Sequence, residues 1–108
     1  MLRKLAKTAA VFAALGDPTR LSLLQRLAAE GPLSIARLTE GAGVTRQAVT
    51  WHLDGLRSAG LAASRRDGRE RVWMLEARNL RAARRSLEEM SAHWDDALER
   101  FRKFVEER

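Results

Sequence analysis

The chain has 108 residues, of which 45% are hydrophobic and 31% charged, a composition typical of one folded domain rather than of a disordered chain. It carries 20 Lys and Arg against 14 Asp and Glu, and the resulting net charge of +6 favours a polyanionic partner. It has no cysteine, which excludes disulfides, thiolate metal sites and thiol redox chemistry.

Residues 1–15 combine a basic start with a short apolar stretch, which has two interpretations. One is a weak secretory signal. The other, which we favour, is an amphipathic helix, because the apolar stretch is interrupted by Thr8 and the next motif follows without a linker. We therefore expect a cytoplasmic protein without a membrane span. The expected inner face of this helix consists of Leu5, Ala9, Phe12 and Leu15.

A second helix is predicted to follow, with Asp17 as its N-cap and Pro18 at its first position. Gly31 and Pro32 end this helix, and a short third helix is expected from Ser34 to Glu40. The predicted buried residues of the second helix are Leu21, Leu24, Leu27 and Ala28.

A fourth helix is predicted over residues 46–58, capped by Thr45 and ended by Gly60. Val49, Leu53 and Leu56 recur at helical spacing and define its core face. The opposite face is polar, so this helix is expected to pack from behind and to present its front to a partner.

Residues 61–76 form two short extended runs around Asp67-Gly68, which predicts a β-hairpin with a type I′ turn. From Asn79, the expected cap, to the end of the chain there is neither proline nor glycine, which predicts one long helix. An apolar seam follows this helix for four heptads: Leu80, Ala83, Leu87, Met90, Trp94, Ala97, Phe101 and Phe104.

The predicted fold is therefore mainly α with a small β-hairpin, a single winged helix-turn-helix domain over residues 1–108 with five helices and a two-stranded wing. Residues 34–58 form the helix-turn-helix, and residues 61–76 form the wing. The basic excess lies in residues 1–78, which hold 13 Lys and Arg against 7 Asp and Glu, whereas residues 79–108 hold 7 of each. We expect the first part to bind a polyanion and the last helix to bind protein.

The outer face of the fourth helix has the residue types that read base pairs in the major groove of DNA. Arg46 suits guanine and Gln47 suits adenine, whereas Thr50 and Trp51 suit a thymine methyl group or the sugar-phosphate backbone. The N–H groups near Thr45 suit a phosphate. The wing arginines suit phosphate or the minor groove; they are Arg65, Arg66, Arg69 and Arg71.

The motifs "LGDPTR", "HLDGLRSAGL" and "RRDGRERVW" strongly resemble the ArsR-type winged-helix transcriptional repressors, closely over residues 10–76 and more loosely in the flanking helices. The resemblance implies a symmetric homodimer, paired through its first and last helices (residues 1–15 and 79–108), that binds a palindromic operator and usually represses its own operon. The expected dimer-interface residues are Leu5, Phe12, Leu87, Met90, Trp94, Phe101 and Phe104.

The chain departs from the metal-sensing members that it resembles. Those members carry cysteines in the segment that here reads "GPLSIARL", Gly31–Leu38. His93 and Asp96 are three residues apart on the last helix, but no second such pair follows. We therefore predict a non-metal-sensing regulator without a cofactor, controlled by an unknown small-molecule effector or by simple autoregulation.

Several alternatives stay open at this point. His52 either makes a hydrogen bond within the fold or contacts a DNA phosphate. The winged helix is alternatively a protein–protein interaction module that does not bind DNA, and an RNA-binding variant ranks third because the aromatic residues form no stacking platform. An enzyme is not expected, since no catalytic set of side chains and no glycine-rich phosphate loop occur.

Overall fold

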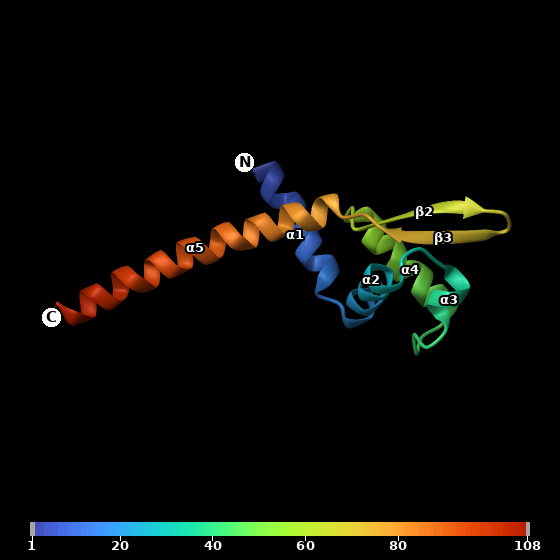
Figure 1. Ribbon diagram of the computed structural model, residues 1–108, viewed down its shortest axis with the longest axis horizontal. Coiled ribbons are helices and arrows are strands. Elements are labelled where there is room, and N and C mark those ends of the chain that lie inside the picture. The colour runs from blue at the N-terminus through green and yellow to red at the C-terminus, as the bar shows by residue number, and fades with distance from the viewer. Residues whose placement is uncertain (1, 108) are drawn as a thin grey trace.

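A computed structural model describes residues 2–107 of the chain, so Met1 and Arg108, the outermost residues of the two expected dimerisation segments, lie outside it. The described residues form five helices and three strands (Figure 1). In chain order these are α1 (Leu2–Leu15), α2 (Pro18–Glu30), β1 (Leu33–Ser34), α3 (Ile35–Thr39), α4 (Arg46–Ser58), β2 (Ala62–Asp67), β3 (Glu70–Leu75) and α5 (Arg78–Glu106).

The predicted winged helix-turn-helix fold is confirmed, with one additional strand. The sheet is antiparallel in the order β1-β3-β2, and Leu33 of β1 lies opposite Trp73 of β3. A strand of two residues is too short to produce an alternating sequence pattern, so the third strand could not be recognised in advance. Strand β1 pairs the two residues just before α3 with the base of the wing.

The hydrophobic core lies between α2, α4 and the sheet. Trp73 is its largest fully buried side chain, and Leu27 and Leu53 are each at most 2% exposed. The predicted caps of α2 and α3 are confirmed, because the side chains of Asp17 and Ser34 accept hydrogen bonds from backbone N–H groups of their helices. These helices therefore begin where the sequence indicates.

Two predicted buried faces are wrong in part. On α1 the core side chains are Val11 and Ala14, whereas Leu5 and Ala9 are exposed. Helix α1 packs against both α2 and α5, so the face that it turns towards them is centred on Val11. Leu5 and Ala9 lie outside this buried face. On α2, Leu23 is buried beside the predicted Leu24 and Leu27, whereas Leu21 and Ala28 are exposed.

The predicted type I′ turn of the wing is also wrong. Asp67 pairs with Glu70, so the two loop residues are Gly68 and Arg69. Gly68 has a φ of +64°, whereas positive φ among residues 2–107 occurs only at glycines and therefore not at Arg69. A positive φ at the first loop residue alone is typical of a type II′ turn, which also suits a hairpin. The arginine at the tip is thus part of the turn.

The long helix α5 begins two residues earlier than a cap at Asn79 predicts, and Asn79 is not its cap. Ala77 occupies the cap position without a side-chain hydrogen bond. Asn79 lies in the first turn, and its Nδ2 donates a 3.1 Å hydrogen bond to the carbonyl oxygen of Ala59, the C-cap residue of α4. This bond joins the start of α5 to the end of α4.

Only the first part of α5 packs on the rest of the chain. α5 crosses α1 near Ala83, and then extends away from the body on the side opposite the wing (Figure 1). The described residues consequently measure 69 × 29 × 20 Å. None of the helices within residues 2–107 is both long and apolar enough to cross a bilayer.

Gly60 provides a test of the junction between α4 and α5. A Cβ atom at Gly60 would lie 2.1 Å from Nδ2 of Asn79, whereas a Cβ atom at Gly41 would meet nothing within 4 Å. Both glycines have positive φ, +74° and +73°, so Gly41→Ala is a matched control for backbone strain. We expect Gly41→Ala to cost about 1 kcal/mol of unfolding free energy. Gly60→Ala should cost about 1–2 kcal/mol more, because it also displaces the Asn79–Ala59 hydrogen bond.

Urea denaturation at one fixed protein concentration measures both free energies. Equal losses for the two variants would show that Asn79 does not stabilise this junction.

Candidate nucleic-acid interface

Helix α4 has the bounds, the cap and the buried face that its sequence predicts. Thr45 accepts a 3.1 Å hydrogen bond at Oγ1 from the N–H of Ala48, and Val49, Leu53 and Leu56 have no exposed surface. Turning the helix about its axis would expose these three side chains, at a cost of about 1.5–3 kcal/mol each. The orientation of α4 is therefore fixed by its inner face.

The predicted reading residues lie on the exposed side of α4. Arg46, Gln47, Thr50 and Trp51 are all exposed, and Trp51 retains 67% of its surface. The hydroxyl group of Thr50 donates a 2.9 Å hydrogen bond to the carbonyl oxygen of Arg46. Thr50 therefore offers its methyl group and an acceptor oxygen to a partner rather than a free donor.

Arg20, which the sequence analysis did not single out, supports Trp51 from α2. Its Nε donates a 2.9 Å hydrogen bond to the carbonyl oxygen of Ala14 at the end of α1. Its guanidinium carbon lies 6.0 Å from the centre of the Trp51 ring, at the outer limit of a cation–π contact. Arg20 therefore links the last turn of α1 to the exposed indole.

His52 faces the protein, towards the cap of α2. Its side chain is only 13% exposed, and its Nδ1 lies 3.7 Å from Oδ1 of Asp17. Nδ1 is buried and has no hydrogen-bond partner within residues 2–107. His52 therefore packs within the fold without the hydrogen bond that was expected of it at Nδ1, and little of its side chain is left to reach a phosphate.

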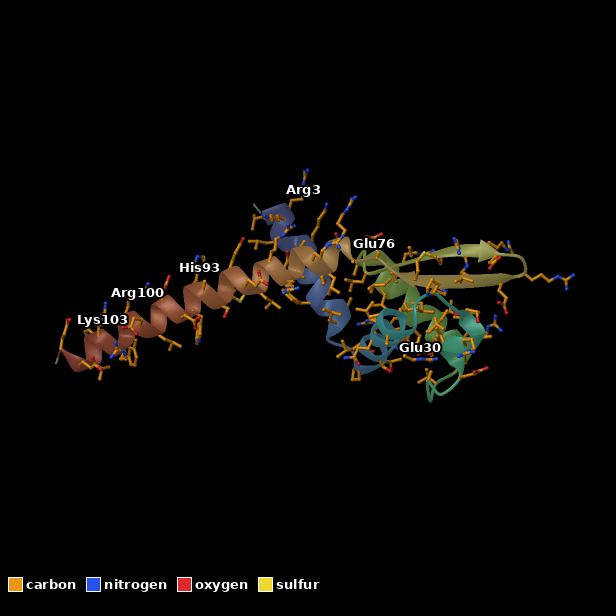
Figure 2. All side chains as sticks on the ribbon, viewed as in Figure 1. Arg3, Glu30, Glu76, His93, Arg100 and Lys103 are labelled. Carbon is orange, nitrogen blue, oxygen red and sulfur yellow. The ribbon has the colours of Figure 1, made fainter. Side chains whose placement is uncertain are left out.

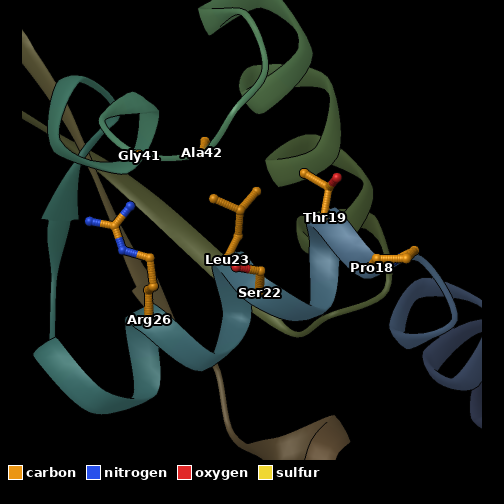
Figure 3. A pocket seen from close by; sticks show the side chains of 7 residues that line it. All are labelled: Pro18, Thr19, Ser22, Leu23, Arg26, Gly41 and Ala42. Atoms are coloured by element: carbon orange, nitrogen blue, oxygen red, sulfur yellow. The ribbon is translucent and has the colours of Figure 1, made fainter.

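Arg26 connects α2 to the turn of the helix-turn-helix, and it too was missed. Its Nη1 donates hydrogen bonds of 3.1 Å to the carbonyl oxygens of Leu38 and Glu40, and its Nη2 donates one of 3.1 Å to Arg37. Figure 3 shows its guanidinium group directed from α2 towards this turn. A cation at the carbonyl end of a helix is favourable, so Arg26 holds α3 in place relative to α2.

The wing presents an exposed row of arginines. Arg65, Arg66 and Arg69 are exposed towards the tip, and the guanidinium of Arg57 from α4 lies 5.7 Å from the ring centre of Trp73 at the base. Nη1 of Arg71 donates a 2.8 Å hydrogen bond to Oγ of Ser64 on the facing strand. The base of the wing is thus anchored to α4, whereas its tip extends beyond the body (Figure 1).

One hollow joins the wing to the exposed side of α4. It is lined by Ile35, Arg46, Thr50, Arg71 and Trp73, so the two arginines flank it from different elements and no lining residue is acidic. Concave surfaces with charges of one sign concentrate the electrostatic potential. The arrangement suits a ligand with closely spaced negative charges, such as a nucleic-acid backbone.

The predicted dimer-interface residues are placed differently on the two helices. Phe12 is half-buried against the core of its own chain, whereas Leu5 is exposed. The five predicted residues of α5 are each 50–66% exposed, and Trp94 is the most exposed of them. Figure 2 shows His93, Arg100 and Lys103 on this part of α5, well away from the body.

The chain is similar to known helix-turn-helix proteins. A family model described as a helix-turn-helix domain matches residues 15–65. The chain is 36% identical over 93 residues to the HTH-type transcriptional regulator Rv2034 of Mycobacterium tuberculosis, covering 86% of this chain and 83% of that protein.

Two solved structures extend the likeness. An ArsR-like transcriptional regulator from Rhodococcus sp. RHA1 is 35% identical, with a TM-score of 0.80 and coverage of 93% of both chains. A homodimeric winged helix-turn-helix DNA-binding domain from Mycobacterium bovis, described as a possible ArsR-family regulator, is 25% identical, with a TM-score of 0.64. That likeness covers 88% of this chain and 84% of the other.

Asp17 predicts how the stability of this region depends on pH. A 3.0 Å hydrogen bond from the N–H of Arg20, assisted by nearby His52, lowers the pKa of Asp17 below its ordinary value of 3.8. A carboxyl group whose pKa is lower when folded stabilises the fold above its ordinary pKa, and this stabilisation is lost as the pH falls through the lower, folded value. We therefore expect Asp17→Asn, which keeps a good cap, to reduce the loss of stability below about pH 4.

Urea unfolding at pH 7 and at pH 3 measures this dependence, with Asp96→Asn on the exposed side of α5 as the control. An acid dependence that is the same in Asp17→Asn and in the unmodified protein would contradict the role of this cap.

Proposed function

The chain belongs to the ArsR family of winged helix-turn-helix transcriptional regulators, and from this premise we propose that it is a homodimeric repressor of its own operon. Each protomer places the exposed side of α4 in the major groove of an inverted-repeat operator, and each wing contacts the flanking backbone. The proposal rests above all on α4, whose apolar face is buried and whose polar face adjoins an arginine-lined hollow.

The division of roles follows from the chemistry of the side chains. Arg46 and Gln47 lie in the first turn of α4, the part of a reading helix that reaches base edges. Arg65, Arg66 and Arg69 contact phosphate, which contributes affinity without sequence preference. Trp51 contacts the sugar-phosphate backbone or a thymine methyl group, supported from behind by Arg20.

A second copy of the chain is the proposed partner of the exposed side of α5. Leu87, Met90, Trp94, Phe101 and Phe104 lie exposed along one face of this helix. The 29 residues of α5 span about 44 Å, long enough for an extended helix–helix contact. A two-fold dimer would present two copies of α4 to half-sites about 34 Å apart, one turn of DNA.

We expect the dimer to be cytoplasmic and to repress transcription because of the position of its binding site on the DNA. A dimer seated on two half-sites upstream of its own gene would occupy DNA that the polymerase needs. A gel shift with the DNA upstream of the gene, against random DNA of the same length, tests the proposal. No shift of either DNA at low salt would instead support the protein–protein interaction module.

Substitutions in α4 and in the wing should have different effects. Gln47→Ala should weaken binding to the operator by about 1–3 kcal/mol and leave binding to random DNA nearly unchanged. Arg66→Ala should weaken binding to both DNAs and reduce the steepness of the salt dependence by about 1 in the log–log slope. Fluorescence anisotropy over a salt series measures both effects, with Arg100→Ala on α5 as the control. Identical effects of the two substitutions on both DNAs would refute this division of roles.

We expect Trp94 to contribute a large part of the stability of the proposed dimer. Burying an aromatic side chain contributes about 1.5–3 kcal/mol, and a symmetric dimer buries two copies, so Trp94→Ala should raise the dimer dissociation constant by roughly 100-fold or more. Sedimentation equilibrium measures the change. Asp96→Ala, on the same stretch of α5 but away from the apolar face, should leave the constant unchanged. An unmodified protein that stays monomeric at high concentration would exclude this dimer.

A further inference from the structure

A small hollow between α1 and α5 has a strongly basic lining. Its cavity volume is about 150 Å³, and it is bordered by Lys4, Lys7, Thr8, Val11, Asn79, Ala82, Arg85 and Ser86. No lining residue is acidic. All of the lining residues belong to α1 and α5, which pack against each other, and none belongs to α4 or to the wing.

The cations of this hollow come from two elements. Lys4 and Lys7 are one turn apart on α1, and Arg85 faces them from α5. Within residues 2–107 none of the three pairs with a carboxylate, whereas the neighbouring Arg84 lies 3.1 Å from Glu88. Like charges gathered around a hollow repel one another, and a bound anion would remove this repulsion.

The remaining lining supplies hydrogen-bond donors and an apolar surface. Ser86 and Asn79 are half-buried, so a hydroxyl group and an amide group border the hollow beside the cations. Asn79 uses one N–H of its amide group on Ala59 and has a second N–H to donate. Val11 and Ala82 contribute apolar surface, which suits a short hydrocarbon part.

From this lining we propose that the hollow is a binding site for a small anion that carries a phosphate or a carboxylate group. The small size of the hollow suits a compact ligand such as phosphate or a short carboxylate. Lys4, Lys7 and Arg85 neutralise the anion, and Ser86 and Asn79 donate hydrogen bonds to it.

This site would be connected to the reading helix through Asn79. The amide group that borders the hollow also holds the carbonyl oxygen of Ala59, at the end of α4. An anion that accepts the second N–H therefore lies two hydrogen bonds from α4. Anion binding does not depend on the proposed DNA contacts, because it involves neither the wing nor the exposed face of α4. The hollow does lie on the same two helices, α1 and α5, as the proposed dimer.

Titration of the ¹⁵N-labelled protein, followed by two-dimensional NMR, tests the site. Inorganic phosphate and succinate are the probes, and sodium chloride at matched ionic strength gives the baseline. We expect saturable shifts at Thr8, Ser86, Ala59 and the side-chain amide of Asn79. Saturation by phosphate alone identifies a phosphate site, saturation by succinate alone identifies a carboxylate site, and saturation by both shows that the shared charge is recognised.

A pair of double variants separates a site from general charge attraction. Lys7→Gln with Arg85→Gln should raise the midpoint for the anion by at least roughly tenfold, because two of the cations are removed. Arg81→Gln with Lys103→Gln removes the same net charge from exposed positions outside the lining and should leave the midpoint unchanged. Circular dichroism checks that all variants fold.

Three results would overturn the proposal. The first is shifts that never saturate or that match those in sodium chloride. The second is an equal change of midpoint in both double variants. The third is weaker binding of the pocket variant, but not of the control variant, to random duplex DNA without added anions, because the cations would then serve DNA.

Discussion

The burial of three side chains on one face of α4 decides what the rest of the protein can do. Val49, Leu53 and Leu56 have no exposed surface, so α4 cannot turn about its axis without losing several kcal/mol of apolar burial. The direction of Arg46, Gln47 and Trp51 is thereby set by residues on the other side of the helix. Thr45 caps the helix and so fixes its first residue. The first turn of α4 therefore contains Arg46 and Gln47.

The excess of positive charge has two different uses in this fold. Arg20 and Arg26 donate to backbone carbonyl oxygens at the ends of α1 and α3, and Arg57 lies against the ring of Trp73. These three arginines connect elements within the chain. The net charge of the chain therefore overstates the positive charge that is available to bind a partner. The arginines of the wing and of the first turn of α4 remain exposed.

The sequence predicted α4 fully because the cap, the apolar spacing and the glycine near its end all agree. It predicted the hairpin but not its turn, because strand register, rather than the Asp-Gly pair alone, decides which two residues form the loop. The inner face of α1 was misplaced because α1 has two neighbours, and spacing along one helix does not show where they lie. The contacts of Arg20, Arg26 and Asn79 connect separate elements, so local patterns contain no trace of them.

The part of α5 that extends from the body has a further consequence. In a single chain it has little tertiary support, and a lone helix of a few turns is only marginally stable in water. A second chain that covers its apolar face would stabilise it by mass action. The cellular concentration of the protein would then determine what fraction of the chains has an ordered C-terminal half of α5. At low concentration most chains would be monomeric, and this segment would be most vulnerable to proteolysis.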